Sequence, residues 1–559
     1  MNKLILNRLN EIAGGLSIDP HSIRLDIPES VEHGDFSSNV AMVNAKKLGL
    51  SPKDLAEKII IEFEKEMPEA IESVHIAGPG FINFRFKDDF LAKKVLESPQ
   101  AKQDSVKEKV MVEYTDPNPF KVFHIGHLMS NAIGESISRL IGYSGKQIIR
   151  ANWQGDVGPH VAKAIWGSLH LESKTDEMPE EYWGRAYVLG NVQSESDPVA
   201  KQEIDEINRK IYDRSDEKIN EIYDKGRRQC LDAFEKIYAR LGTKFDNYFF
   251  EGIEGRKGQA IVDEFREQGV FEESDGAIVF KGEKYGLHTR VFTTSKGLPT
   301  YETKELGLNR EKFSLYPDLD QSIIITANEQ SDYFRVLLKV MDLVYPEIAT
   351  KTKHISHGML RFASGKMSSR TGNVISAESL ISEIKEMVIK KIADRDFSKS
   401  ETDQISDEIA IGAIKYTILR SSIGGDIIFD SASSISFEGD SGPYLQYSAV
   451  RAASVLEKAR SAEQKNSGEI VFPDKVGILE RLIVCFSYTV ERAQSELAPQ
   501  IVANYLISLA GAFNAYYATQ TIIDNNDPLS PYRLALVKAF RDTMEQGLFI
   551  LGIKIPTKM

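Results

Sequence analysis

The stretch from Asp116 to Gly134, DPNPFKVFHIGHLMSNAIG, combines residue types that suit phosphate binding. His124 and His127 stand three positions apart, so on a helix their imidazoles share a face and both can donate to one phosphate. Gly126 leaves room for a ligand against the backbone. The alternative is a pair of solvent-facing histidines at a helix start. A zinc site is disfavoured, because the metalloprotease pattern needs i,i+4 spacing with a glutamate.

A second stretch, Gly365 to Ser376 (GKMSSRTGNVIS), places Lys366 among small hydroxyl and glycine residues. This composition favours a loop that can close on a polyphosphate, although such a lysine is more often part of a surface turn. It is not a Walker A loop, because Leu360 stands where that motif has its first glycine and Met367 follows the lysine. Together the two stretches indicate nucleotide chemistry more strongly than either does alone.

The residues around the histidines predict a parallel α/β sheet that presents them at a ligand-binding edge. Val110 to Thr115 has the pattern of a buried strand, the prolines of DPNP end it, and the next residues have helical apolar spacing. A helix that starts just after a strand directs its free N–H groups and positive dipole end at the ligand crevice. Further apolar runs, QIIRAN and SIIITAN, alternate with helices as in a parallel sheet.

The chain of 559 residues is too long for one hydrophobic core, so several domains are expected. Residues 1–105 alternate helical and strand patterns and predict an α+β domain that ends in a polar linker. Residues 106–380 predict the α/β domain, with a charged helical insertion at about 168–250. Residues 381–559 show helical periodicity without a strand series and predict an all-α domain.

Composition limits the class of protein. The net charge of −13 argues mildly against nonspecific nucleic-acid binding but leaves room for a local basic groove. No run approaches the roughly 20 apolar residues that a membrane span needs, and the N-terminus has the pattern of an amphipathic helix rather than a signal peptide. Cys230 and Cys485 are too far apart in sequence for a cysteine zinc cluster or a disulfide framework. We therefore expect a cytoplasmic protein.

The two motifs, in this order and with a sheet between them, resemble the His-Ile-Gly-His and Lys-Met-Ser-Lys-Ser signatures of class I aminoacyl-tRNA synthetases. Further segments resemble the arginyl-tRNA synthetases in particular, over nearly the full length. They are VEYTDPNPFKVFHIGHL, NWQGDVG, GLPTYETKELG, GKMSSRTG, FEGDSGPYLQYSAVR and RLALVKAFRDTMEQGLFILGIKIPTKM, with HGDFSSNVAM and GPGFINF in the N-terminal domain. The resemblance implies a Rossmann-like class I catalytic domain, an additional N-terminal domain that contacts the outer corner of tRNA, and an all-α anticodon-binding domain.

The family's reaction joins arginine to tRNA through an arginyl-adenylate, with ATP consumed and AMP and pyrophosphate released. The resemblance gives catalytic roles to His124, His127, Lys121 and Lys366, with the lysine of the second motif stabilising the leaving pyrophosphate. The ATP-binding residues that it implies are His124, Gly126, His127, Lys366, Met367, Ser368, Ser369 and Arg370. Physical chemistry agrees, since attack on the α-phosphorus builds negative charge that positioned cations and N–H donors stabilise.

The second motif lacks one cation of the class signature, because Ser369 stands where its second lysine would be. Many arginyl enzymes share this departure and have a lysine just upstream of the first histidine, which is Lys121 here. We therefore hypothesise that Lys121 supplies the missing charge, with Arg370 as the alternative.

The arginine side chain requires a planar acceptor, preferably a carboxylate in bidentate geometry. The resemblance places Tyr301 along that side chain and Glu305 where the family more often has aspartate. It assigns Glu113 and Asn118 to the substrate's ammonium and carboxylate, and Gln330 to another pocket position. From the residues alone, Tyr301 could equally be a core aromatic and Glu305 a solvated helix charge. Asp156 matches a family aspartate whose role we leave open.

For the anticodon arm, the resemblance implies contacts from Tyr444, Tyr447 and Arg451, since aromatic and cationic groups stack on and pair with RNA. Packing between helices is the alternative. We expect tRNA(Arg), L-arginine and ATP with Mg²⁺ as partners, no zinc, no membrane and a monomer, with tRNA present before arginine is activated. The competing functions are another class I synthetase or a noncatalytic tRNA-binding paralogue, against which the two histidines and Lys366 weigh.

Overall fold

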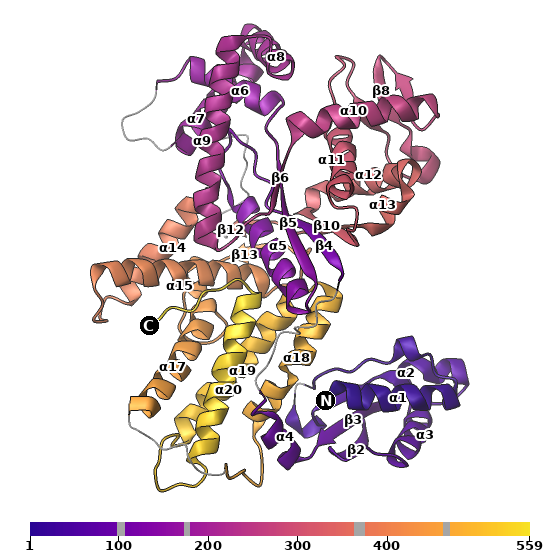
Figure 1. Ribbon diagram of the computed structural model, residues 1–559, viewed down its shortest axis with the longest axis vertical. Coiled ribbons are helices and arrows are strands. Elements are labelled where there is room, and N and C mark those ends of the chain that lie inside the picture. Colours follow the sequence, from indigo (N-terminus) through magenta and orange to yellow (C-terminus); the bar gives the residue numbers. More distant parts are fainter. Residues whose placement is uncertain (29, 98–106, 173–178, 363–374, 462–469) are drawn as a thin grey trace. The chain divides into compact units, whose positions relative to one another are not determined.

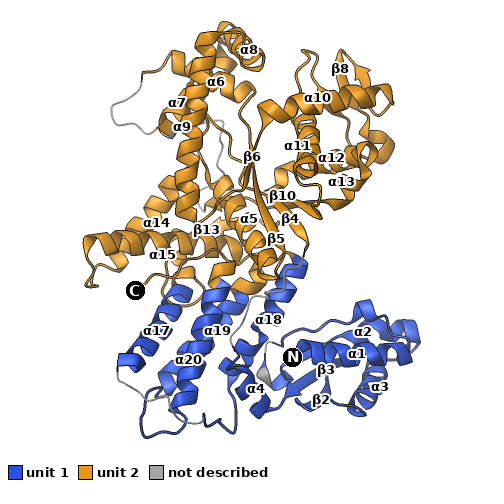
Figure 2. Cartoon of the chain, in the orientation of Figure 1, with its two compact units in different colours: residues 1–100, 444–496, 504–547 blue, residues 101–443, 497–503, 548–559 orange. Residues whose placement is uncertain are grey.

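The computed structural model describes residues 1–28, 30–97, 107–172, 179–362, 375–461 and 470–559. The chain divides into two compact units (Figures 1 and 2). Unit 1 comprises Met1–Gln100, Tyr444–Glu496 and Asn504–Gly547, and unit 2 comprises Ala101–Pro443, Leu497–Ala503 and Leu548–Met559. Each unit is built from segments that are distant in sequence.

Unit 2 contains a five-stranded parallel sheet with the order β11-β10-β4-β5-β6. Its strands are β4 (Lys109–Glu113), β5 (Gln147–Gln154), β6 (Asn247–Phe250), β10 (Gln321–Ala327) and β11 (Thr352–His357). The strand order reverses between β4 and β10, and in open α/β sheets the crevice at the carboxyl ends of such a pair is where ligands bind. The residues that follow β4 and β10 therefore lie at the expected ligand-binding edge.

Two helices cover opposite faces of the central strand β4. Side chains alternate along a strand, so Met111 and Glu113 point to one face and Val112 to the other. Met111 shares a hydrophobic cluster with Leu308 of α11 (Tyr301–Leu315). On the opposite face, Tyr114 just beyond the strand packs against α5 (Ile125–Tyr143), where a side chain at Gly134 would collide with the tyrosine ring. The histidine helix and the YETKELG helix thus lie on opposite sides of one strand.

The other elements of unit 2 surround this sheet (Figure 1). A three-stranded antiparallel sheet has the order β7-β8-β9, and β12 pairs with β13 in parallel. These strands are β7 (Glu272–Ser274), β8 (Ala277–Phe280), β9 (Arg290–Thr293), β12 (Leu360–Phe362) and β13 (Ile427–Phe429). The remaining helices are α6 (Pro159–Leu169), α7 (Pro179–Ser196), α8 (Pro198–Asp213), α9 (Glu217–Leu241), α10 (Glu251–Glu267), α12 (Ser331–Val344), α13 (Pro346–Lys351), α14 (Ala377–Lys391), α15 (Lys399–Leu419) and α16 (Ser431–Ser434).

Unit 1 joins the N-terminal residues to helices from the C-terminal part of the chain (Figure 2). Its antiparallel sheet has the order β1-β3-β2. The N-terminal elements are α1 (Asn2–Leu16), β1 (Phe36–Ser38), α2 (Val40–Asn44), α3 (Pro52–Glu64), β2 (Ile71–Ala77), β3 (Phe81–Phe86) and α4 (Asp88–Lys94). The C-terminal helices are α17 (Gly442–Ser461), α18 (Ile478–Glu496), α19 (Pro499–Thr519) and α20 (Ser530–Ile550), of which only α18 lies entirely in unit 1.

The predicted fold class is confirmed, but two details differ from the sequence-based expectation. The helical insertion was expected to extend to about residue 250, whereas Asn247–Phe250 forms β6 of the main sheet. No strand was expected after about residue 380, yet Ile427–Phe429 forms β13. Both strands are shorter than five residues, too short for their alternation to stand out in sequence.

No helix in the described ranges combines the length and the apolar character that a membrane span requires.

Candidate active site

The loop between β4 and α5 holds unusual backbone conformations that surrounding groups stabilise. Thr115, Asp116 and Phe120 have positive φ angles of 81°, 46° and 68°, a region that non-glycine residues seldom adopt. The backbone N–H of Thr115 donates to Ser130 Oγ (3.0 Å), and Asp116 Oδ1 accepts from the backbone N–H of Trp153 (2.8 Å). Strained backbone conformations that surrounding contacts stabilise are typical of functional sites. They orient side chains in directions that an unstrained loop does not allow.

The two histidines form a stacked pair at the start of α5. His124 is the N-cap residue, and its Nδ1 accepts from the backbone N–H of Gly126 at 3.1 Å. His127 Nδ1 accepts from the backbone N–H of His124 at 3.2 Å, which completes a capping box. The ring centroids are 3.7 Å apart and the planes are 16° from parallel. A Cβ at position 126 would lie 2.9 Å from Cε1 of His124, so Gly126 makes room for the imidazole itself.

These hydrogen bonds define the chemistry of the pair. Burial lowers the pKa of His124 to about 4, with Lys121 adding to the shift, and burial together with His124 lowers the pKa of His127 well below its usual value. Both rings are therefore neutral near pH 7. Because each Nδ1 accepts a backbone N–H, the proton of each neutral ring resides on Nε2. The pair consequently offers two Nε2–H donors beside the positive end of the helix dipole.

Lys121 lies close to the histidines on the same loop. Its Nζ stands 5.0 Å from the ring centroid of Tyr187 on α7, within cation–π range. Burial lowers the pKa of Lys121, while Glu251 opposes that shift. The positive charge of Lys121 also helps to lower the pKa of both histidines, which indicates that its ammonium is near them.

An acidic cluster of buried side chains, which we call the predicted arginine pocket, lies on the α11 side of β4. Glu113, the last residue of β4, is 1% exposed, and its Oε2 lies 2.7 Å from Nζ of Lys312, which is fully buried. Glu305 is 6% exposed, so it is not a solvated surface charge, and its Oε2 accepts from Asn309 Nδ2 at 3.3 Å. Burial raises the pKa of Glu305 to about 8, with Glu113 adding to the shift and Lys312 opposing it.

The other residues predicted to contact arginine are less buried than Glu113 and Glu305. Tyr301 begins α11 one turn before Glu305 and is 56% exposed, which excludes a core role. Asn118 lies against Gly155, where a Cβ would come within 2.1 Å of its Oδ1. Gln330 follows β10, the neighbour of β4, and is exposed. Tyr301 and Gln330 are thus both exposed, unlike Glu113 and Glu305.

Asp156 has a structural role that the sequence left open. Its Oδ1 accepts from the backbone N–H of Gly252 (2.9 Å), and its Oδ2 accepts from Tyr223 (3.1 Å) and Arg227 (2.9 Å). These contacts tie the loop after β5 to α9 and to the start of α10. Asp156 therefore positions helices rather than presenting a free carboxylate.

The segment that contains Lys366, Met367, Ser368, Ser369 and Arg370 lies outside the described residues. The chain that follows it is bound to the histidine motif. The backbone N–H of Ala377 donates to Phe123 O (2.9 Å), that of Ile125 donates to Ile375 O (3.4 Å), and Ser376 forms a β-bridge with His124. Residues 375–377 are thus anchored beside the imidazole pair.

This arrangement can bind a triphosphate and a cationic amino acid at the two faces of one strand end. Neutral N–H donors, a helix N-terminus and a lysine are suited to phosphate oxygens, and buried carboxylates are suited to a guanidinium.

Comparison with known proteins agrees with this geometry. The family described as "tRNA synthetases class I (R), catalytic domain" matches residues 88–431. The "DALR anticodon binding domain" matches residues 445–559, and the "Arginyl tRNA synthetase N terminal domain" matches residues 1–86. The arginine–tRNA ligase of Clostridium acetobutylicum is 30% identical over 100% of this chain and 99% of its own length. The chain belongs to the arginyl-tRNA synthetase family. Its activity is therefore arginine–tRNA ligation, and ATP is a substrate.

Other members of the arginyl-tRNA synthetase family are similar over the same extent. The arginine–tRNA ligase of Clostridium perfringens is 31% identical over 100% of this chain and 99% of its own length. The solved arginyl-tRNA synthetase of Thermus thermophilus has a TM-score of 0.84 at 23% identity, with 99% of each chain covered. That of Plasmodium falciparum has a TM-score of 0.78 at 19% identity, with 100% of this chain and 98% of the other covered. The family fold thus extends over the whole chain.

The residues predicted to contact the anticodon arm of an arginyl-tRNA synthetase substrate lie in unit 1 and pack between helices. Arg451 on α17 donates to Asn514 Oδ1 on α19 (2.5 Å) and to the hydroxyl of Tyr447 (2.9 Å). Asn514 Nδ2 also donates to the hydroxyl of Tyr444 at 3.0 Å. These half-buried groups therefore hold α17 against α19, and their contact with tRNA stays a prediction.

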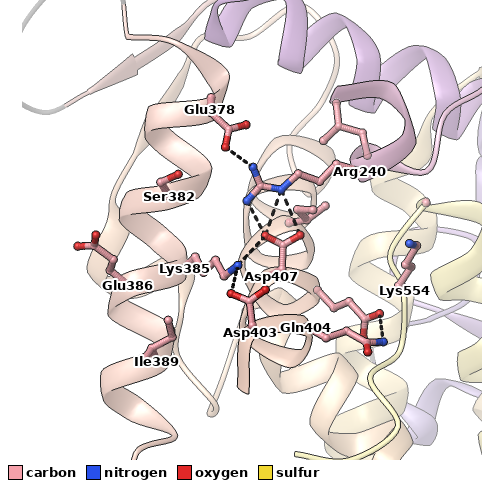
Figure 3. Close-up of a pocket in the computed structure, with 14 residues that line it drawn as sticks. Arg240, Glu378, Ser382, Lys385, Glu386, Ile389, Asp403, Gln404, Asp407 and Lys554 are labelled. Atoms are coloured by element: carbon pink, nitrogen blue, oxygen red, sulfur yellow. Dashed lines mark hydrogen bonds and ion pairs between the residues drawn. The ribbon is translucent and has the colours of Figure 1, made fainter. Parts of the chain in front are cut away.

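A charged cavity of about 790 Å³ lies between the end of α9, α14, α15 and the C-terminal residues (Figure 3). Its walls are largely ion-paired: Arg240 bonds Glu378 and Asp407, and Lys385 bonds Asp403 (Figure 3). None of the described lining residues is a predicted site residue.

Sequence reasoning missed Asp116, Glu251, Lys304 and Lys312. Lys304 and Glu251 form a buried ion pair of 2.6 Å next to the pocket, and Lys312 pairs with Glu113. The segment YETKELGLNREK has the composition of a solvated helix, so nothing in its periodicity marks its charges as buried. The spacing of Glu305 and Lys312, i and i+7 on one helix face, was the available signal.

Proposed function

We propose that the helix start bearing His124 and His127 and the pocket at Glu113 and Glu305 are the two halves of one arginyl-adenylate site. A carboxylate oxygen of L-arginine bonds to the α-phosphorus of ATP, and the bond to pyrophosphate breaks. A ribose hydroxyl at the 3′ end of tRNA(Arg) then attacks the arginyl carbonyl, and AMP leaves. The observation that carries the proposal is the position of both halves at one strand end, since Glu113 ends β4 and His124 caps the helix that follows.

On the nucleotide side, the imidazoles donate through Nε2–H to phosphate oxygens of ATP, beside the backbone of Gly126. Because the rings are already fixed by hydrogen bonds, they need no reorganisation when negative charge grows in the transition state. Lys366 stabilises the leaving pyrophosphate, with Met367, Ser368, Ser369 and Arg370 around it. The anchoring of residues 375–377 beside His124 supports this convergence.

On the amino-acid side, Glu305 accepts the guanidinium, with Tyr301 along the arginine side chain and Gln330 at the rim. Glu113 and Asn118 orient the ammonium and carboxylate of arginine. The pairing of Glu113 with Lys312 holds the carboxylate in place, so that it presents a defined charge to the substrate.

The remaining contacts are proposed from family membership. Residues 1–105 bind the outer corner of tRNA(Arg), 106–380 carry catalysis, and 381–559 bind the anticodon arm through Tyr444, Tyr447 and Arg451. Mg²⁺ arrives with ATP and is held mainly by phosphates and water, since no group of three potential ligands gathers in the described ranges. The enzyme acts as a cytoplasmic monomer.

The proposal is tested by aminoacylation of a tRNA pool with radiolabelled arginine, beside the variant His127→Ala. We expect arginyl-tRNA formation by the wild type and a rate lower by about 10² to 10³ in the variant, the typical effect of removing one transition-state donor. Equal rates would refute the role of the histidine pair. Preference for another amino acid would refute the pocket assignment.

The lysine hypothesis is tested by comparing Lys121→Ala with Arg370→Ala in single-turnover activation of arginine with tRNA present. We expect the Lys121 variant to lose much more of the rate, because its ammonium lies near both histidines. Equal losses would refute the assignment, and a larger loss in the Arg370 variant would favour the alternative.

A further inference from the structure

Carboxyl groups outnumber cations among the residues of α11, β4 and the neighbouring segments at the predicted arginine pocket. Glu305, Asn309 and Lys312 follow one another at i, i+4 and i+7, so they line one face of the helix opposite the end of β4. Glu113 and Asp116 come from β4 and the loop that follows it. Oδ1 of Asn309, which is fully buried, has no hydrogen-bond partner, although Nδ2 of the same amide contacts Glu305. The polar groups here are not fully satisfied by one another.

Ion pairing divides the acidic groups into two classes. Glu113 is paired with Lys312 at 2.7 Å, and Glu251 is paired with Lys304 at 2.6 Å. Asp116 and Glu305 have no ion-pair partner in the part of the chain that the structure describes. Within the described ranges, the side chain of Asp116 accepts a hydrogen bond only from the backbone N–H of Trp153, and that of Glu305 only from Asn309. Two carboxyl groups of the pocket thus lack a compensating cation.

The substrate carries two positive groups, the α-ammonium and the guanidinium, which match this deficit. We propose that the empty pocket holds Asp116 and Glu305 as protonated carboxylic acids, and that arginine displaces these protons to solvent when it binds. The inference rests on the proposed arginine site and deepens it. Asp116 becomes a specificity-determining residue, and Lys312 becomes a positioning residue that holds the side chain of Glu113. A competing amino acid of the same shape, with an uncharged urea or amide in place of the guanidinium, would displace fewer protons. One carboxylic acid of the pocket would then face that urea or amide.

The titration behaviour of the cluster supports this. Burial, then Glu113, raise the pKa of Asp116 well above its usual value, and burial, then Glu113, raise that of Glu305 to about 8. Lys312 opposes both shifts without abolishing them. The charged and titratable groups of other residues that interact electrostatically with the two carboxyls are Glu113, Glu251, Lys312, Tyr333 and Tyr345. Below about pH 8 a proton on Glu305 therefore competes with the ligand.

The experiment is calorimetric titration of the full-length enzyme with L-arginine near pH 7, in buffers of different ionisation enthalpy such as PIPES and Tris. The dependence of the binding enthalpy on the buffer counts the protons released. We expect between one and two protons per arginine, and an affinity that rises with pH between about 6 and 7.5 by about tenfold per unit for each proton. Binding with no proton exchange and no such slope would overturn the inference.

Three variants locate the protons. Glu305→Gln and Asp116→Asn should each release one proton fewer, and the asparagine can still accept the N–H of Trp153. Glu302→Gln is the matched control, because Glu302 lies on the same helix as Glu305, is equally buried and already has Arg290 at 3.6 Å. The proton count of this variant should equal that of the wild type.

Unchanged proton counts in both test variants would overturn the assignment. If a variant no longer binds arginine, the pH dependence of the arginine affinity of the wild type decides whether protons are released on binding. Failure of the wild type to bind arginine would refute the proposed site itself.

Discussion

At the scale of single residues, the histidine pair shows how backbone hydrogen bonds determine side-chain chemistry. Each Nδ1 is occupied as an acceptor, so each ring can donate only through Nε2, and burial keeps both rings uncharged. A charged pair would attract ATP more strongly at long range. A neutral pair avoids repulsion between two stacked cations 3.7 Å apart and still provides two fixed donors.

This predicts that the two imidazoles do not titrate near neutral pH. In ¹⁵N-histidine-labelled enzyme, the signals that disappear in the His124→Asn and His127→Ala variants should show the neutral Nε2–H tautomer from pH 8 down to about 5. The expected pH range follows from the lowered pKa of His124, about 4, because the charged form of this ring appears only when the pH falls to that value. A titration midpoint near 6.5 for either ring would contradict the arrangement.

At the scale of elements, helices gain their roles from what they pack against. α11 places Thr303, Lys304, Glu305, Asn309 and Lys312 in the interior, although its sequence is that of a surface helix. α15 has a similar buried cation. Lys415 is 1% exposed, and its ammonium donates to Leu241 O at the end of α9 (2.6 Å) and to Gly552 O just beyond α20 (2.7 Å). One lysine thus holds the end of α9 and the C-terminal segment at Gly552 to α15.

The Lys415 contact predicts a pH-dependent contribution to stability. Burial, with Arg139 and Lys554 nearby and Glu135 opposing, lowers the pKa of Lys415 to about 7, against 10.5 in the unfolded chain. Between these values the unfolded state binds more protons than the folded state, so the free energy of unfolding rises with pH. Lys415→Met removes this pH-dependent contribution to the free energy of unfolding. The difference in thermal midpoint, wild type minus variant, should therefore increase from about pH 7 to about pH 9.

Lys399→Met is the matched control for this measurement, because Lys399 lies on the same helix and is exposed. It should keep the pH dependence of the wild type. If the Lys415 variant also keeps it, the buried lysine does not change its protonation on folding.

At the scale of the whole molecule, the N-terminal residues are integrated into unit 1 rather than appended to it. Phe36, Phe84 and other N-terminal residues share one hydrophobic cluster with Cys485 of α18. Arg481 of the same helix bonds Asp35 (2.6 Å) and Asp88 (2.5 Å), and Asp35 is almost fully buried. Segments about 400 residues apart in sequence therefore stabilise one another.

Removing this buried pair should destabilise unit 1 strongly. Arg481→Met leaves the Asp35 carboxylate buried without its cation, which typically costs about 3–5 kcal/mol. Arg492→Met is the control, because its pair with Asp26 is about half exposed and such pairs contribute about 0–1 kcal/mol. Scanning calorimetry should show one transition lowered by Arg481→Met and almost unchanged by Arg492→Met. Recovery in the double variant with Asp35→Asn would confirm the charge as the cause, and equal effects of the two single variants would contradict it.

The sequence by itself determined the histidine motif at a helix start, the parallel sheet and the family. His124, Gly126 and His127 lie within one helical turn, and β4 with α5 follows from local hydrophobic periodicity, so neighbouring residues carry this information. Only the tertiary structure decided the pocket's charge and the composition of unit 1. The pairing of Glu113 with Lys312 joins residues about 200 positions apart, and that of Arg481 with Asp35 joins residues still farther apart. Whether a charge is buried, and which charge faces it, depends on long-range packing, and periodicity along the chain does not encode it.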